Sequence, residues 1–593
     1  MSDRGRLLAS FILSPPVGFT SCVASDSSNS VQCLATRALS RNRKLASRWT
    51  GSASFESFSR RNVVRFVPAR RVSSTDSSVS VYALSEVEER PAVAVAKLED
   101  ALPDKLDMPS GGLTGIYDDD PTAIFQEGRV LEDSWLTSAL SRAPPVPHPL
   151  FQAWQEEARR EFLASQWSMP TRKTEGWRQT MLKDMQNIRF APSSSQSLPM
   201  PSADDVSALA SKIEESLNSR AVIVNGRFSK DLSSLTGLPE GVKVGGWEVM
   251  AGIERTLPIL ANAANWQDPR EPIIRRSSHT AATPWARLPL VRAWSPFVAL
   301  NQASFEDVVC VFIPKDCVCE TPIHLVNVCT SGALPTAIYP RTLVILEEGS
   351  SATVVEEYVT LPGSGSTFVA PVSELHLDAS STLNHIIQQN CALDAFVLQC
   401  SAAQQEANSN YSNTAVGIGG QIYRMDMDVT IPESHTETTL NGLNVSWNKM
   451  TSENHSRLML SAPNCKTRQF QALVATDRGK VVFSGKVQIT KQAQKTDGDQ
   501  MCRSLIMGRG ARVEMLPQME VQADDVKCTH GATCADIDPE SLFYLQTRGL
   551  DVEAARELCV VGFAVVALEA VPFDDIRTKV KERVRQCVKK PSA

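Results

Sequence analysis

Residues 346–354 read LEEGSSATV and residues 377–383 read LDASSTL, two stretches built on one pattern. Each has an apolar run, a corner of small or acidic residues, and a second β-prone run. Small residues are favoured where the backbone must turn tightly. Residues 506–513, IMGRGARV, have the same shape and complete a weak internal repeat. Stacked corners of this kind indicate a parallel β-helix, and a β-sandwich with glycine-rich turns is the alternative.

Short alternating runs surround these corners and read as strands. β-branched residues in short runs bounded by Gly, Ser, Asn and Asp are typical of an all-β region. The runs are residues 341–346, 354–359, 383–389, 424–431 and 481–490. Together they predict a mainly β core over residues 290–535.

Helical spacing precedes the β region. Apolar residues from Phe151 to Phe162 recur at helical intervals and predict an amphipathic helix that ends before Pro170. A second helix is expected over residues 203–217. Residues 143–289 are therefore predicted to form an N-terminal domain of helical and mixed structure.

Helical signals return after the β region. Asp538 is a suitable N-cap, and Gly549 is placed to end the helix that follows. Asp551 caps a second predicted helix, and residues 574–588 carry an apolar stripe that predicts a third. We expect residues 536–593 to form a C-terminal helical domain.

The first 80 residues have the composition of a targeting segment. Residues 1–80 contain 19 Ser and carry 12 Lys and Arg against 4 Asp and Glu. A Ser-rich, Arg-rich and acid-poor N-terminus is typical of an organelle transit peptide. We expect residues 1–84 to be a disordered transit peptide for a plastid, with the mitochondrion as the alternative. Residues 85–142 are acidic and broken by Pro and Gly, which predicts a variable linker.

The body of the 593-residue chain is acidic, because the net charge is −6 although the first residues are basic. This balance argues against a nucleic-acid binder and against attachment to an anionic membrane, since both require basic surface. The longest uncharged apolar run, residues 558–568, is about half of what a membrane-spanning helix needs. Ordinary hydrophobic content, 42%, excludes a collagen and a wholly disordered protein.

Known catalytic signatures are missing from the sequence. There is no P-loop, nucleophile elbow, zincin motif or dinucleotide fingerprint, so we expect no nucleotide site on this chain. The 14 cysteines include no C-x-x-C pair, which predicts free and mostly buried thiols. Seven of the 8 histidines have no candidate partner nearby in sequence, and we expect them to be surface or satisfied core residues.

Residues 524–533, DDVKCTHGAT, are the exception. On a strand, Cys528 and His530 point to the same face, and a thiolate with an imidazole is a soft site suited to iron, zinc or copper(I). Lys527 is expected to lower the pKa of the thiol. Gly531 is expected to let a backbone or a cluster approach closely.

The same run resembles a known family. Residues 524–533 and LFYLQTRG at 542–549 resemble the C-terminal signature of the SufB/SufD iron–sulfur cluster assembly proteins. FSGKV at residues 483–487 and AQKTD at 493–497 are also similar to that family. So is EGWR at residues 175–178, which a threonine follows two positions later.

Within the family, two features resemble SufD: the short helical segment before EGWR and the absence of clustered N-terminal cysteines. The tripeptide from Cys528 to His530 is similar to the Cys-Ser-His of SufD, with Thr529 in place of Ser. One position departs from this pattern. Cys502 stands where SufB has its cluster-building cysteine, and Arg503 replaces the Asp that follows it there. The chain is then a SufD with an extra thiol near the assembly site, or a SufB-type scaffold itself.

The resemblance implies a central right-handed parallel β-helix flanked by N-terminal and C-terminal helical domains. It implies a non-catalytic scaffold that pairs with SufB through the β-helix, docks the ATPase SufC through its C-terminal helices, and serves downstream apo-proteins. His530 would support a transient iron–sulfur cluster shared with SufB, with Cys528 and then Cys502 as further candidates. A purely architectural partner without metal contact is the alternative, and whether a reduced flavin binds the assembled complex stays open. The residues expected to dock SufC are Leu542, Phe543, Leu545, Leu558, Val561, Ile576 and Val580.

Overall fold

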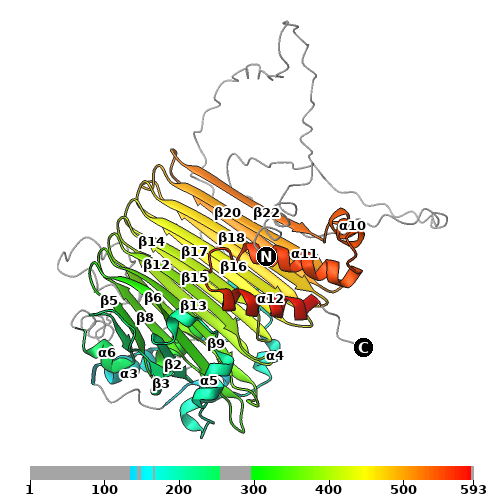
Figure 1. Cartoon of the computed structure of the whole chain (residues 1–593). Helices are drawn as coiled ribbons and strands as arrows, with labels where there is room; N and C mark the ends of the chain where they lie inside the picture. Colours follow the sequence, from blue (N-terminus) through cyan, green and yellow to red (C-terminus); the bar gives the residue numbers. More distant parts are fainter. Residues whose placement is uncertain (1–133, 143–148, 165–166, 254–294, 589–593) are drawn as a thin grey trace, which may run out of the picture. The chain divides into compact units, whose positions relative to one another are not determined.

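The centre of the computed structural model is a solenoid made of two parallel sheets (Figure 1). The structure describes residues 134–142, 149–164, 167–253 and 295–588. Each of eight turns gives one strand to sheet A and the next strand to sheet B. The β-helix prediction is confirmed in this coarse form, whereas its right-handed sense stays a prediction.

The strands that make up the eight turns run in sequence order from β5 to β22. In sheet A they are β5 (Val309–Ile313), β8 (Arg341–Leu346), β11 (Val372–Leu377), β13 (Phe396–Gln405), β15 (Ile422–Ile431), β17 (Thr451–Leu460), β19 (Lys480–Ile489) and β21 (Arg512–Val521). In sheet B they are β6 (Val318–Cys329), β9 (Ser351–Thr360), β12 (Thr382–Asn390), β14 (Asn410–Gly417), β16 (Glu437–Ser446), β18 (Lys466–Thr476), β20 (Asp497–Met507) and β22 (Lys527–Ala535).

One corner of the solenoid is a stack of residues with positive φ. Gly349 and Ser380 occupy this corner in successive turns, with φ of 70° and 61°. The N–H of Gly349 donates to the carbonyl of Ala379 at 3.0 Å, so each turn is tied to the next. The first two repeat copies are therefore consecutive corners, whereas the third, around Gly508, lies on the opposite corner beside Asp477. The other members of the first stack are Asp316, Asn408, His435, Asn464 and Lys495.

The N-terminal segments close one end of the solenoid and cover the outer face of sheet A. Strand β4 pairs antiparallel with β5, and β3 pairs antiparallel with β2, which extends sheet B. In its described part, the domain predicted over residues 143–289 thus contributes strands to the solenoid as well as helices. The elements before β5 are α2 (Ser134–Ala139), α3 (Pro149–Ala164), η2 (Glu175–Trp177), α4 (Lys183–Gln186), β1 (Ala191–Pro192), η3 (Ser193–Ser195), α5 (Ala203–Leu209), η4 (Glu214–Ser216), β2 (Arg220–Val224), β3 (Arg227–Ser234), β4 (Lys243–Gly245), α6 (Trp247–Ala251) and α9 (Pro296–Ser304). The short strands β7 (Thr336–Ile338) and β10 (Thr367–Val369) lie between the turns.

Two N-terminal predictions need correction. The helix expected over residues 203–217 is shorter, because Ala210 takes an extended conformation with ψ of 153° and ends α5. The predicted linker, 85–142, ends in helix α2, whose Trp135 and Leu136 are buried in the core outside sheet A. The predicted transit peptide and the rest of that linker lie outside the described residues.

The EGWR segment docks onto the solenoid through a buried arginine. The guanidinium of Arg424 lies 4.0 Å from the ring centre of Trp177 and donates to the carbonyl of Gly176. The hydroxyl of Thr180 donates to Glu453 at 2.7 Å. This segment therefore has an intramolecular packing role in the structure.

Three buried histidines each pair with a buried glutamate, which confirms that these are satisfied core residues. They are His324 with Glu357 at 3.0 Å, His385 with Glu356 at 2.9 Å, and His455 with Glu453 at 2.9 Å. Burial opposes ionisation of Glu357, but the hydrogen bond from His324 and the nearby Lys579 hold its pKa below the ordinary value. A neutral imidazole donating to a carboxylate explains the arrangement, since burial lowers the pKa of His324.

Stability should therefore fall as the pH drops below the ordinary histidine pKa. The unfolded chain takes up a proton on His324 at about pH 6.5, whereas the folded chain does so only at lower pH. Stability is complete above that value and falls below it by at most about 1.4 kcal/mol per pH unit for this proton. Denaturation midpoints at about pH 7.5 and 5.5 measure the slope. His324→Gln keeps a donor for Glu357 and should flatten it; an unchanged slope contradicts the assignment.

The C-terminal segment forms three helices, of which the last two cover the outer face of sheet B and the first packs on the second. They are α10 (Pro539–Thr547), α11 (Val552–Val566) and α12 (Asp574–Val588), and Figure 1 shows α11 and α12 across β16 and β18. The predicted caps are confirmed: Asp538 accepts from the N–H groups of Glu540 and Ser541, and Asp551 from that of Ala554. Gly549 ends α10 with φ of 88°. Within the described ranges, no helix is long and apolar enough to cross a membrane.

Candidate functional site

In the part of the chain that the structure describes, no further strand follows β21 and β22 at the end of the solenoid opposite β3 and β4. Strand β22 is the last strand of sheet B and pairs only with β20, while β21 is the last of sheet A and pairs only with β19. Most residues of β21 and β22 are exposed or half-buried, whereas the strands of the preceding turns are largely buried. This end thus presents two free strand edges (Figure 1).

Cys528 and His530 lie on the face of β22 that continues the interior of the solenoid. His530 is in register with Gln500, which is in register with Gln469 in the turn before. Paired residues in a parallel ladder point to the same side of the sheet. Gln500 and Gln469 are buried inside, so His530 occupies the same interior column where no further turn covers it. The two candidate ligands are brought together on one exposed edge.

The predicted activation of Cys528 is wrong. Half-burial raises the pKa of this thiol, with partial relief from the N–H of Gly498, and Lys527 is not among the causes of the shift. Lys527 is exposed at the start of β22. The space beside Gly531 is also filled, because a Cβ there would lie 3.1 Å from the Met501 side chain.

Cys502 lies one strand further inside than the exposed edge. It pairs in register with Ala532 and is fully buried among Leu473, Phe483 and Met515. Burial raises the pKa of its thiol strongly. The role predicted for Cys502 stays a prediction, and as the chain stands this thiol is neutral and covered.

Cys534 was not singled out from the sequence. It is exposed on β22 and shares the interior face with His530, since the two are four positions apart on one strand. Its charge would raise the pKa of Cys502, which places the two thiols near each other. The spacing of Cys528, His530 and Cys534 at even intervals was a signal that could have identified it.

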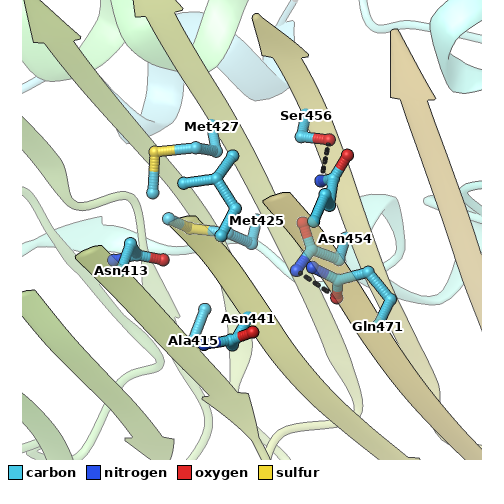
Figure 2. A pocket seen from close by; sticks show the side chains of 10 residues that line it. Asn413, Ala415, Met425, Met427, Asn441, Asn454, Ser456 and Gln471 are labelled. Carbon is cyan, nitrogen blue, oxygen red and sulfur yellow. Dashed lines mark hydrogen bonds between the residues drawn. The ribbon is translucent and has the colours of Figure 1, made fainter. Parts of the chain in front are cut away.

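A chain of side-chain amides runs down the interior from this end. Gln500 Nε2 donates to Gln469 Oε1 at 2.7 Å, and Gln469 Nε2 donates to the hydroxyl of Ser456 at 2.6 Å. Figure 2 shows the continuation, in which Asn454 donates to Gln471 at 3.1 Å. Gln469, Ser456, Asn454 and Gln471 are among the residues that line a cavity of about 10 Å³, which matches a single water molecule. The interior of the solenoid is polar at this point.

The predicted docking residues divide into buried and exposed sets. Ile576 and Val580 are fully buried between α12 and sheet B, so they pack within the chain. Phe543 is 68% exposed on α10, and its neighbour Tyr544 is 48% exposed. The remaining members are Leu542, half-buried; Leu545 and Val561, buried; and Leu558, exposed.

Metal ligands do not gather into a complete site in the chain alone. In the part that the structure describes, no three His, Cys, Asp or Glu side chains are grouped so that they could hold a metal ion. The twelve cysteines described are free, and most are buried, as expected.

The chain is similar to proteins of iron–sulfur cluster assembly. Residues 328–563 match the family model described as SUF system FeS cluster assembly, SufBD core domain. An iron–sulfur cluster assembly SufBD family protein of Synechocystis is 28% identical over 71% of this chain and 87% of its own length. Protein ABCI7, chloroplastic, of Arabidopsis thaliana is 29% identical over 78% and 90%. The iron–sulfur cluster assembly protein SufD of Escherichia coli is 27% identical over 70% and 89%.

Proposed function

Because the chain belongs to the SufBD family of iron–sulfur cluster assembly proteins, whose members are scaffold components, we propose that it is a SufD-type, non-catalytic scaffold subunit. Its uncovered solenoid end pairs with SufB, and a nascent cluster is held transiently at the interface. The cluster is cargo that passes on to apo-proteins. The observation that carries the proposal is the position of His530 and Cys528 on the interior face of the last strand.

The free edges support pairing with a second solenoid. Exposed strand edges are templates for another strand, and natural proteins cover or disrupt them unless they are used. Here β22 is nine residues long and β21 is ten, both longer than an average strand. The partner's own end strands would complete the hydrogen bonding and bury the interior face that now ends at His530.

A shared site explains why this chain has only part of a ligand set. Cys528 and His530 offer one sulfur and one nitrogen donor, Cys534 on the same face offers a second sulfur, and the remaining ligands would come from the partner. Replacing thiolate ligands by imidazole raises the reduction potential of an iron–sulfur centre and changes how the ligands bind the iron. We infer that a mixed shell suits a cluster that must be released.

His530→Ala tests the site. We expect anaerobic reconstitution of the full chain with SufB and SufC to give at least about 10-fold less cluster absorbance per complex, since an iron ligand is lost. Thr529→Ala is the matched control, because Thr529 lies on the same strand but bonds Asp499 on the other face. Complex formation is checked for each variant by size-exclusion chromatography. Undiminished absorbance in an intact His530→Ala complex would leave an architectural role.

We propose that SufC docks on α10 through Phe543, because this large aromatic side chain is 68% exposed there, beside Tyr544 at 48%. Aromatic anchors of this kind commonly dominate interface energies.

Phe543→Ser should weaken SufC binding about 30-fold or more, since losing an aromatic anchor costs about 2 kcal/mol or more. Titration calorimetry measures the affinity. Met200→Ser is the control, being 65% exposed far along the chain. Equal affinities of both variants and the parent chain would rule out this surface.

A plastid is the proposed compartment. The composition of residues 1–80 and the similarity to a protein named chloroplastic support it. Import of the full chain into isolated chloroplasts, with loss of an N-terminal segment on a gel, is the corresponding measurement; mitochondrial import alone would contradict it.

A further inference from the structure

We propose that Gln500 is a positioning residue for His530: its side-chain oxygen accepts a hydrogen bond from one imidazole N–H and so directs the other ring nitrogen to the iron of the cluster. This inference rests on the proposed function, because it assigns the support of the ligand named there. Gln500 itself does not touch the cluster.

The register brings the two residues together. Gln500 and His530 are direct partners across β20 and β22, and their side chains leave the same face. Gln500 is 0% exposed, whereas His530 is exposed at the open end. The buried amide of Gln500 is therefore the neighbour of His530 on the inner side of the exposed strand.

One atom of that amide is left unused. Gln500 Nε2 donates to Gln469, but Gln500 Oε1 is buried and has no hydrogen-bond partner among the described residues. A buried acceptor without a donor is destabilising, so such groups usually have a purpose or a partner that arrives later. The register neighbour that carries N–H groups is His530. When a partner covers the end, turning the imidazole inward satisfies both residues.

Hydrogen bonds to residues of the preceding turns fix the orientation of the Gln500 amide. Gln469 Oε1 accepts from Gln500, and Gln469 Nε2 is in turn fixed on Ser456. Opposite them, Gly485 leaves the room that the amide needs, because a Cβ there would lie 2.4 Å from Gln500 Nε2. Because Gln500 Nε2 already donates to Gln469, Gln500 Oε1 is the atom left to accept a hydrogen bond from a group at the exposed end.

The chemistry of histidine ligands gives this contact a consequence. A neutral imidazole has one N–H and one lone pair, and the hydrogen bond made by the first decides which nitrogen can bind metal. Metal-bound histidines usually donate the other N–H to a carbonyl or carboxylate, and losing that acceptor typically weakens metal binding about 10- to 100-fold.

The test uses the full chain assembled anaerobically with SufB and SufC, comparing the parent with Gln500→Leu, Gln500→Glu and His530→Ala. Two quantities are measured: the ¹⁴N hyperfine coupling of the reduced cluster by pulsed electron paramagnetic resonance, and the rate of iron loss to a chelator. For Gln500→Leu we expect a changed ¹⁴N coupling and about 10-fold faster loss of iron. Gln500→Glu should restore both, because a protonated carboxyl donates to Gln469 and accepts from His530.

A matched control separates positioning from a general loss of packing. Gln399→Leu removes a buried amide of the same solenoid, in β13, whose two polar atoms also lack partners in the described part of the chain. It should leave the coupling and the iron loss unchanged. If Gln500→Leu unfolds, Gln500→Glu and the control still decide: a Gln500→Glu complex with a changed coupling overturns the inference.

The outcomes also distinguish this inference from the proposed function. A coupling that survives in His530→Ala removes the metal role of His530 and the inference with it. A coupling that disappears in His530→Ala but is identical in the parent and Gln500→Leu keeps the proposed function and overturns the inference alone.

Discussion

Arg424→Met should lower the free energy of unfolding by about 3 kcal/mol, because the buried carboxylate of Glu453 and the half-buried one of Asp426 lose their cation. The guanidinium is 5% exposed and holds Asp426 with two hydrogen bonds, at 2.8 and 2.9 Å. It also lies 3.7 Å from Glu453 and stacks on Trp177. Its loss therefore removes the contact that ties the EGWR segment to the solenoid.

Arg468→Met is the matched control for this change. Arg468 also holds an aspartate with two hydrogen bonds, but its pair with Asp497 is 46% and 41% exposed. An exposed pair of this kind contributes about 1 kcal/mol or less. Urea denaturation gives both values, and limited proteolysis should show faster cleavage near Arg178 in Arg424→Met alone. Equal destabilisation of the two variants would contradict the role of burial.

Gly479→Ala should destabilise the chain at the upper end of the about 1–3 kcal/mol that overpacking costs. Gly479 lies at the corner between β18 and β19, where a Cβ would stand 2.4 Å from the carbonyl carbon and oxygen of Ser446. These are backbone atoms of the previous turn, so they cannot swing aside as a side chain does. The corner would have to open, and with it the stacking of two turns.

Gly365→Ala distinguishes this steric effect from the general effect of losing a glycine. A Cβ at Gly365 meets its nearest atom, Ser331 Oγ, at 3.5 Å, an ordinary contact. We expect a change within about 1 kcal/mol, of either sign, because alanine restricts the unfolded chain. Denaturation midpoints of the two variants, measured side by side, should differ clearly. Similar midpoints would mean that the backbone at the Gly479 corner can shift to accept the added Cβ at little cost.

Local signals predicted the parts of the fold that local chemistry determines. The caps at Asp538 and Asp551 and the small residues around Gly349 and Ser380 satisfy backbone groups within a few positions, and the structure has them as expected. Helix α2 was missed because its six residues are stabilised by the core around Trp135, which distant segments supply. The burial of Ile576 and Val580 is likewise decided by sheet B and not by their apolar stripe.

The candidate site was predictable as far as the alternation of a strand reaches. Placing Cys528 and His530 on one face required only that the segment be β. The state of the Cys528 thiol required its surroundings: burial and Asp497 raise its pKa, whereas the adjacent Lys527 makes no contribution. Gln500 could not be connected with His530 from sequence, since 30 positions of chain and a full turn separate them.

The difference between the two ends of the solenoid limits how many subunits can join edge to edge. Sheet A finishes at its first end in a strand of only three residues, β4, and sheet B finishes in the reversed strand β3 with exposed Lys230 and Asp231. Short and charged edges of this kind resist further pairing. If subunits join as proposed, the described part of the chain has one usable end, so two such ends would close as a pair and could not grow into a filament.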